Sequence, residues 1–259
     1  PREGTWPSHR QQKGGQQDPG NWTLHHGLKS NTHWRMYIWP MRWIPNALTM
    51  GNVFFGCMAI TLVPGMDLQG ITLWMTASLI CDALDGWASR KLGVEGEMGL
   101  QLDSLADAIT FGLLPSLMAY QILLDLSFAV PSLAFIVVIA SVYRLARFNV
   151  GEAGKKGFIG LPTPAHALFI LGLAHAQLDG LIQLSAYALL ALIALSSYSL
   201  NASWPVMSFK DMPSGFAAQK YRWLFLVSSL ILLVTFELAA LTFIIPLLLL
   251  FSAIEKRFA

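Results

Sequence analysis

Charged residues are scarce in this chain. Only 12% of its 259 residues are Asp, Glu, Lys or Arg, about half of what a soluble domain carries. In contrast, 54% are hydrophobic and the mean hydropathy is +0.52. This composition predicts a polytopic helical membrane protein. The formal net charge of +2 gives no argument for nucleic-acid binding, and we expect no nucleic-acid partner.

The chain is also poor in cysteine and, near its N-terminus, in aliphatic residues. The cysteines, Cys57 and Cys81, both fall in apolar segments, so no disulfide framework is predicted. Residues 1–34 are rich in Gln, Gly, His and Asn and lack the apolar core of a signal peptide. We therefore expect residues 1–40 to be a disordered cytoplasmic tail and residues 41–259 to form the transmembrane catalytic domain.

Long apolar runs fill the rest of the chain. A helix needs about 20 residues to cross the hydrocarbon core of a bilayer. The runs therefore predict an all-α, polytopic transmembrane helical bundle of about eight spans, with a range of about six to eight because two runs are short. The runs cover residues 44–63, 70–91, 99–124, 128–149, 163–178, 182–200, 222–235 and 237–254.

Lys and Arg are absent from every second connection between these predicted spans. With about eight spans, all 17 Lys and Arg residues lie on the side of the N-terminus. The opposite connections carry only acidic residues, namely Asp67, Asp125, Asp179 and Glu237. The positive-inside rule then predicts an integral protein of the cell (inner) membrane with both termini in the cytoplasm.

Four aspartates lie at the ends of two predicted spans, where a charge is costly. Asp82 and Asp85 end the second span and share a helical face, as do Asp103 and Asp107 at the start of the third. Because the two spans are consecutive and antiparallel, both pairs should meet at the cytoplasmic side. Divalent cations would offset the repulsion among the carboxylates, which indicates a metal–diphosphate site. The alternative is an ion or proton pathway in a transporter, although such sites usually lie near the midplane.

The residues around these aspartates form a recognisable motif. They are Asp82, Asp85, Gly86, Ser89 and Arg90, followed by Gly99, Asp103 and Asp107. The motif resembles the signature of the CDP-alcohol phosphatidyltransferase family, D-x-x-D-G-x-x-A-R and then G-x-x-x-D-x-x-x-D. One position departs from it, because Ser89 stands where the family usually has Ala. Upstream, Pro45, Asn46 and Thr49 resemble the family's P-N-x-x-T segment.

The resemblance implies a fold, a reaction and a set of roles. It implies the CDP-alcohol phosphatidyltransferase fold, transfer of a phosphatidyl group from CDP-diacylglycerol to an alcohol, and a homodimer in the lipid bilayer. The implied cofactor is a pair of divalent ions, Mg²⁺ or Mn²⁺, bound by the four aspartates, with Asp107 also accepting the alcohol proton. The implied contacts to the CDP-lipid are Asn46, Thr49, Gly86, Ser89, Arg90 and Gly99. Gly172 and Ala176 have a spacing that suits close helix packing.

Two further segments narrow the resemblance to one branch. The Arg144, Arg147 and Asn149 segment and the segment 160–165 resemble the phosphatidylserine synthase branch. That branch implies L-serine as acceptor, phosphatidylserine and CMP as products, and acceptor binding by Arg144, Arg147 and Asn149. Both arginines could equally be plain cytoplasmic anchors. Other acceptors (glycerol 3-phosphate, an inositol compound or choline) and a metal- or proton-coupled transporter remain as alternatives.

Overall fold

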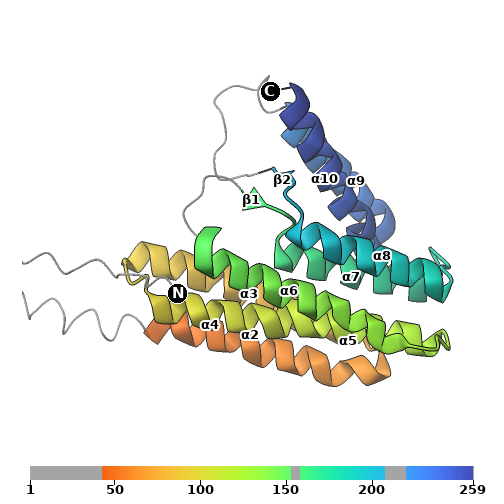
Figure 1. Cartoon of the computed structure of the whole chain (residues 1–259), viewed down its shortest axis with the longest axis horizontal. Coiled ribbons are helices and arrows are strands. Elements are labelled where there is room, and N and C mark those ends of the chain that lie inside the picture. Colours follow the sequence, from red (N-terminus) through yellow and green to blue (C-terminus); the bar gives the residue numbers. More distant parts are fainter. Residues whose placement is uncertain (1–42, 153–157, 208–219, 259) are drawn as a thin grey trace, which may run out of the picture.

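The computed structural model describes residues 43–152, 158–207 and 220–258 (Figure 1). The predicted N-terminal tail, residues 1–40, lies outside the described residues. The helices are α2 (Trp43–Leu62), α3 (Leu68–Leu92), α4 (Glu97–Asp107), α5 (Leu114–Asp125), α6 (Ile136–Arg147), α7 (Thr163–Leu178), α8 (Ala186–Asn201), α9 (Lys220–Phe236) and α10 (Leu241–Phe258). Each predicted apolar run coincides with a helical segment, so the helical character is confirmed.

Shorter elements begin, join or end several of these helices. The 3₁₀ turns are η1 (Val63–Gly65), η3 (Pro131–Phe135) and η6 (Glu237–Ala240), and the π-helical turns are η2 (Ala108–Leu113) and η4 (Phe148–Glu152). The turn η2 makes α4 and α5 one continuous rod and begins directly after Asp107. The apolar pattern predicted this rod as a single span but gave no sign of the π-turn, a feature often found at functional sites.

Not all of the described backbone is helical. Strand β1 (Phe158–Ile159) pairs antiparallel with β2 (Pro205–Val206) and ties the connection after α6 to the connection after α8. The all-α prediction did not include this pairing, because two residues are too short a run to show a strand pattern.

Four ranges of the described residues are long and apolar enough to cross a membrane. They are Trp43–Gly65, Glu97–Asp125, Pro131–Val150 and Lys220–Glu255, while Ala186–Asn201 is apolar but shorter. The last range contains α9 and most of α10, and these two helices lie side by side and lean away from the other helices in Figure 1. The structure thus supports a protein with several membrane-spanning helices.

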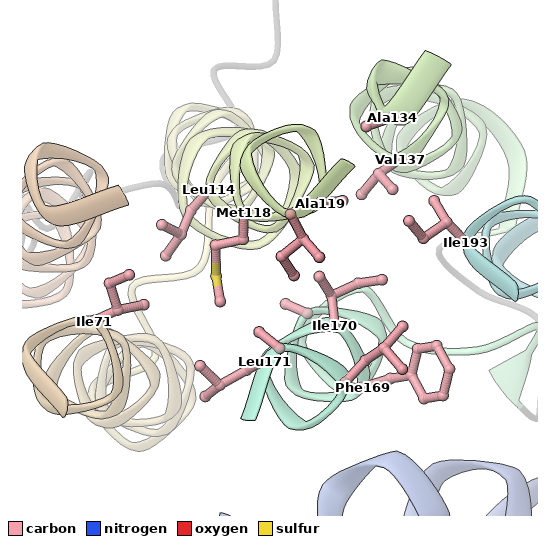
Figure 2. Close-up of a cluster of buried hydrophobic side chains, with 14 of the residues drawn as sticks. Ile71, Leu114, Met118, Ala119, Ala134, Val137, Phe169, Ile170, Leu171 and Ile193 are labelled. Carbon is pink, nitrogen blue, oxygen red and sulfur yellow. The ribbon is translucent and has the colours of Figure 1, made fainter. Parts of the chain in front are cut away.

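The core lies where α3, α5, α6, α7 and α8 meet. Figure 2 shows Ile71, Met118 and Leu171 pointing toward one another between α3, α5 and α7. Val137 of α6 and Ile193 of α8 extend the same cluster. All five of these side chains are almost completely buried, so side-chain packing fixes these helices relative to one another.

The α9–α10 hairpin is attached to the bundle through α7. Gly172 of α7 packs against Leu241 and Thr242, so closely that a Cβ at Gly172 would come within 2.6 Å of the Thr242 backbone nitrogen. Ala176, one turn further along α7, is also fully buried. The close helix packing predicted from the small residues is therefore observed at Gly172, where it joins α7 to the start of α10 within the same chain.

Candidate metal and diphosphate site

Two consecutive helices bring three carboxylates together. Asp82 and Asp85 lie on the last turns of α3, and Asp103 lies on α4 after the short connection 93–96. One carboxylate oxygen from each of the three lies within 4.8 Å of the other two. In the part of the chain that the structure describes, no other group of three His, Cys, Asp or Glu side chains converges in this way. The convergence predicted from the spacing is therefore observed for these three aspartates.

The fourth aspartate lies beside this group. The carboxyl group of Asp107 lies close enough to that of Asp82 for the two groups to interact electrostatically. Asp107 is only 8% exposed, and its Oδ1 is buried without a hydrogen-bond partner among the described residues. A buried acceptor of this kind calls for a donor or a cation, because leaving it unmet costs free energy.

The composition of the cluster suits a divalent cation. Its donors are carboxylate oxygens only, the ligands that hard cations such as Mg²⁺ and Mn²⁺ prefer. Converging carboxylates repel unless a cation or a proton offsets their charge. The residues therefore fit a divalent metal site, with Asp82, Asp85 and Asp103 as its closest set.

The residues assigned to the CDP-lipid lie on α2, α3 and α4, the first of which contacts this cluster through Thr49. The Thr49 hydroxyl donates to Oδ2 of Asp85 at 2.6 Å, which positions that carboxylate. Oδ1 of Asn46 lies 3.9 Å from the position of a Cβ on Gly99, so the first turns of α2 and α4 are adjacent. The Arg90 guanidinium folds back along α3, with Nη1 3.2 Å from the position of a Cβ on Gly86. Ser89, half-buried, precedes Arg90 on the same helix.

The residues assigned to the acceptor divide into two groups. Arg144 Nη1 donates to the carbonyl of Leu200 at 2.5 Å, and Arg147 Nη1 donates to that of Asn201 at 3.3 Å. Both arginines thus contact the C-terminal end of α8, where the helix dipole favours a cation. They also join α6 to α8.

Asn149 makes a different contact from the two arginines. It exchanges hydrogen bonds with Ser104, its Nδ2 donating to Oγ at 3.0 Å and its Oδ1 accepting from Oγ at 3.2 Å. Ser104 lies on α4 directly after Asp103. Asn149 therefore connects the π-turn η4 to the helix that carries two of the aspartates. The role of Ser104 was not predicted, because nothing in the sequence indicated that η4 would reach α4.

The sequence did not predict a buried polar layer that lies one helical turn from the carboxylates. Asn52 of α2, Ser78 of α3 and Thr110 of η2 are all completely buried and hydrogen-bonded together. Their position in the sequence could have indicated this layer. Each is a polar residue in an apolar run and lies one helical turn from a residue of the predicted site.

Comparison with known proteins gives one consistent result. Residues 42–254 match the model of a protein family described as CDP-alcohol phosphatidyltransferase. A CDP-diacylglycerol–serine O-phosphatidyltransferase of Bacillus subtilis (strain 168) is 36% identical over 125 residues, which are 48% of this chain and 71% of that protein.

Archaeal relatives show similar identity. An archaetidylserine synthase of Methanothermobacter thermautotrophicus is 35% identical over 130 residues, 49% of this chain and 55% of that protein. A CDP-diacylglycerol–serine O-phosphatidyltransferase of Methanocaldococcus jannaschii is 35% identical over 153 residues, 59% of this chain and 71% of that protein. The similarity to these relatives thus extends over half or more of each relative's length.

Proposed function

The chain belongs to the CDP-alcohol phosphatidyltransferase family, and from this premise we propose that it transfers a phosphatidyl group from CDP-diacylglycerol to L-serine. The products are phosphatidylserine and CMP, so the protein is a transferase of phospholipid biosynthesis. The single observation that carries the proposal is the convergence of Asp82, Asp85 and Asp103 at the junction of α3 and α4. The names of the relatives support serine over other acceptors.

The four aspartates hold the cofactor in this proposal. Asp82, Asp85, Asp103 and Asp107 bind a pair of divalent ions, Mg²⁺ or Mn²⁺. Bound there, the ions supply positive charge to the diphosphate and to the departing CMP. The electrostatic interaction of Asp107 with Asp82 supports a role for Asp107 next to the other three carboxylates.

Asp107 also acts as the general base. The serine hydroxyl oxygen forms a bond to the lipid-side phosphorus of CDP-diacylglycerol, and the bond from that phosphorus to the CMP oxygen breaks. The hydroxyl proton moves to a carboxylate oxygen of Asp107, and CMP leaves with the electron pair of the broken bond. The burial of Asp107 supports this role, because it keeps bulk water from competing with the acceptor.

The residues around the cluster bind the CDP end of the lipid. Arg90 pairs with a phosphate, while Gly86 and Gly99 let the nucleotide approach the helices closely. Asn46 and Ser89 contribute further contacts to the CDP end. Thr49 acts through Asp85, to which its hydroxyl donates.

Arg144, Arg147 and Asn149 bind the serine acceptor. Serine differs from the other candidate alcohols in pairing a carboxylate with an ammonium group, and guanidinium groups suit carboxylates. The hydrogen bonds between Asn149 and Ser104 support this proposal, because they hold the end of α6 against the helix that carries Asp103 and Asp107.

The membrane arrangement follows from the apolar helices. We propose about eight spans in the cell (inner) membrane, with both termini and the site on the cytoplasmic side, and a homodimer as the working unit. The water-soluble serine then reaches the site from the cytoplasm, while the acyl chains of CDP-diacylglycerol stay in the bilayer.

The test is CMP release by purified protein from CDP-diacylglycerol in detergent–lipid micelles. Serine, glycerol 3-phosphate, inositol and choline are supplied one at a time with Mg²⁺ or Mn²⁺. The proposal expects release that depends on serine and stops with a chelator. Release with another acceptor only would overturn the roles of Arg144, Arg147 and Asn149. No release with any acceptor from folded protein would overturn the whole proposal and favour the transporter alternative.

A further inference from the structure

Directly beneath the carboxylates lies the polar layer formed by Asn52, Ser78 and Thr110. The Ser78 hydroxyl lies 2.7 Å from the Asn52 carbonyl oxygen and 2.5 Å from Asn52 Oδ1. The Thr110 hydroxyl donates to the same carbonyl at 3.3 Å. Asn52 thus joins three separate elements, α2, α3 and η2, at one completely buried point.

The layer is linked to the site by helix geometry. One helical turn from Asn52 is Thr49, which holds Asp85. One turn from Ser78 along α3 is Asp82, and one turn before Thr110 is Asp107. A shift of any member of the layer would therefore move a carboxylate above it.

The packing of α2 against α4 and η2 places Asn52 at about the level of Asp107 along the bundle. Gly99 of α4 lies beside Asn46 of α2. Further down, the Thr110 hydroxyl lies against Gly56, where any Cβ would overlap it. Because both helices descend from the site in the same direction, Asp107, between Gly99 and Thr110, lies at the level of Asn52.

Two buried polar atoms in this region lack partners among the described residues. They are Nδ2 of Asn52, a donor, and Oδ1 of Asp107, an acceptor. The Ser78 hydroxyl donates to the oxygen side of the Asn52 amide, which leaves Nδ2 as the atom presented elsewhere. Each unpartnered atom costs free energy when buried, and one water molecule hydrogen-bonded to both atoms would remove both costs.

We propose that Asn52 is a positioning residue for the metal and diphosphate site, with Nδ2 donating to a water molecule that in turn donates to Oδ1 of Asp107. Ser78 and Thr110 hold Asn52 in place for that contact. The inference rests on the proposed function for its kinetic consequences, but not for its effect on metal binding. Hydrogen bonds to ligand carboxylates commonly set metal affinity and activity, typically by about 10- to 100-fold.

The first experiment compares wild-type protein with Asn52→Ala in detergent. The affinity for Mn²⁺, measured from the electron paramagnetic resonance signal of free Mn²⁺, should fall about 10-fold or more. With serine and CDP-diacylglycerol, kcat should fall about 10- to 100-fold while KM for CDP-diacylglycerol stays within about 2-fold. A merely structural role would lower Tm without moving the Mn²⁺ affinity of the folded protein.

Ser78→Ala keeps the inference testable if Asn52→Ala does not fold. It leaves the Asn52 side chain intact but frees the orientation of its amide, so Mn²⁺ affinity and kcat should fall in the same direction by a smaller factor. Thr110→Val should also lower both, whereas Thr110→Ser, which keeps the hydroxyl, should restore them. The matched control is Ser116→Ala, whose buried hydroxyl donates to the carbonyl of Ala134 away from the site.

The outcomes separate this inference from the proposed function. Unchanged Mn²⁺ affinity and kcat in folded Asn52→Ala would overturn the inference and leave the transfer reaction standing. Weakened Mn²⁺ binding in a protein that releases no CMP with any acceptor would support the inference and overturn the reaction. A loss in Ser116→Ala equal to that in Ser78→Ala would show that any buried hydroxyl has this effect, and would also overturn the inference.

Discussion

Acidic residues lie at both ends of the helical bundle, but within the described ranges only one end has a converging cluster. At the α3–α4 junction, Asp82, Asp85 and Asp103 point their oxygens at one another. At the opposite end, Asp67, Asp179 and Glu237 line a cavity of about 710 Å³ between the α2–α3, α7–α8 and α9–α10 connections.

The difference lies in what each carboxylate contacts. Asp67 caps α3 by accepting from the Gly70 amide at 3.1 Å, and Asp179 lies 3.6 Å from Nδ1 of His175. Those acids interact with their own helix termini or near neighbours. Asp82 on α3 and Asp107 on α4 instead interact electrostatically with each other. Acidic residues at a membrane surface thus indicate a metal site only where the fold makes them converge.

The largest expected effect comes from Asp107→Asn. It should lower kcat by about 10²- to 10⁴-fold, because the amide cannot accept the serine proton. Glu237→Gln, the matched change at the opposite end, should leave CMP release within about 2-fold of wild type. Turnover near the wild-type rate in folded Asp107→Asn would falsify the base assignment.

The second-largest effect is expected when a chelator removes the divalent metal, which should affect the α3–α4 junction but not the opposite end of the bundle. Addition of EDTA should stop CMP release and lower Tm, and excess Mg²⁺ or Mn²⁺ should restore both. A ligand at 100 times its Kd stabilises the folded state by about 2.7 kcal/mol, so the shift in Tm is measurable. Asp103→Asn should lose most of the metal-dependent shift, while Asp179→Asn should keep it. Equal shifts in both variants would place the metal elsewhere.

Thr49→Val should have an intermediate effect. It removes the hydrogen bond to Asp85, and such bonds to charged groups contribute about 1.5–3 kcal/mol. Metal affinity should therefore fall about 10- to 100-fold, while Thr49→Ser should remain close to wild type. Thr61→Val is the control, because that hydroxyl donates to the carbonyl of Met58 at the far end of α2. Wild-type metal affinity in Thr49→Val would assign Thr49 to another role.

The smallest effect is expected at the opposite end. Asp179→Asn should change the free energy of unfolding by less than about 1 kcal/mol, because the Asp179 side chain is 64% exposed and its pairing with His175 is screened by water. CMP release should not change. A large loss of activity in Asp179→Asn would show that the two ends are coupled. It would contradict the assignment of the metal site to the α3–α4 junction alone.

Much of the site could be predicted from local spacing. Asp82 and Asp85 share a face of one helix, and Asp103 and Asp107 share a face of the next, because helical periodicity is a local property. The short connection 93–96 then forces the two pairs to the same end. The apolar runs likewise predicted the helices, since their length and composition are read directly from the chain.

Other features depended on contacts between distant segments. The donation from Thr49 to Asp85, the pairing of Asn149 with Ser104, and the contact between Gly172 and Thr242 each join different helices. No local pattern encodes which helix faces which, because that choice follows from the packing of the whole core.

The sequence by itself determined the helical membrane character, the position of the carboxylates on two adjacent helices, and the family signature. Only the tertiary structure decided that Asn52 of α2 and Thr110 of η2 would form a buried hydrogen bond next to the site. It also decided that Arg144 and Arg147 would contact the end of α8. The physical reason is range: helix formation and spacing depend on residues within a turn or two, whereas buried polar contacts exist only after the helices have packed.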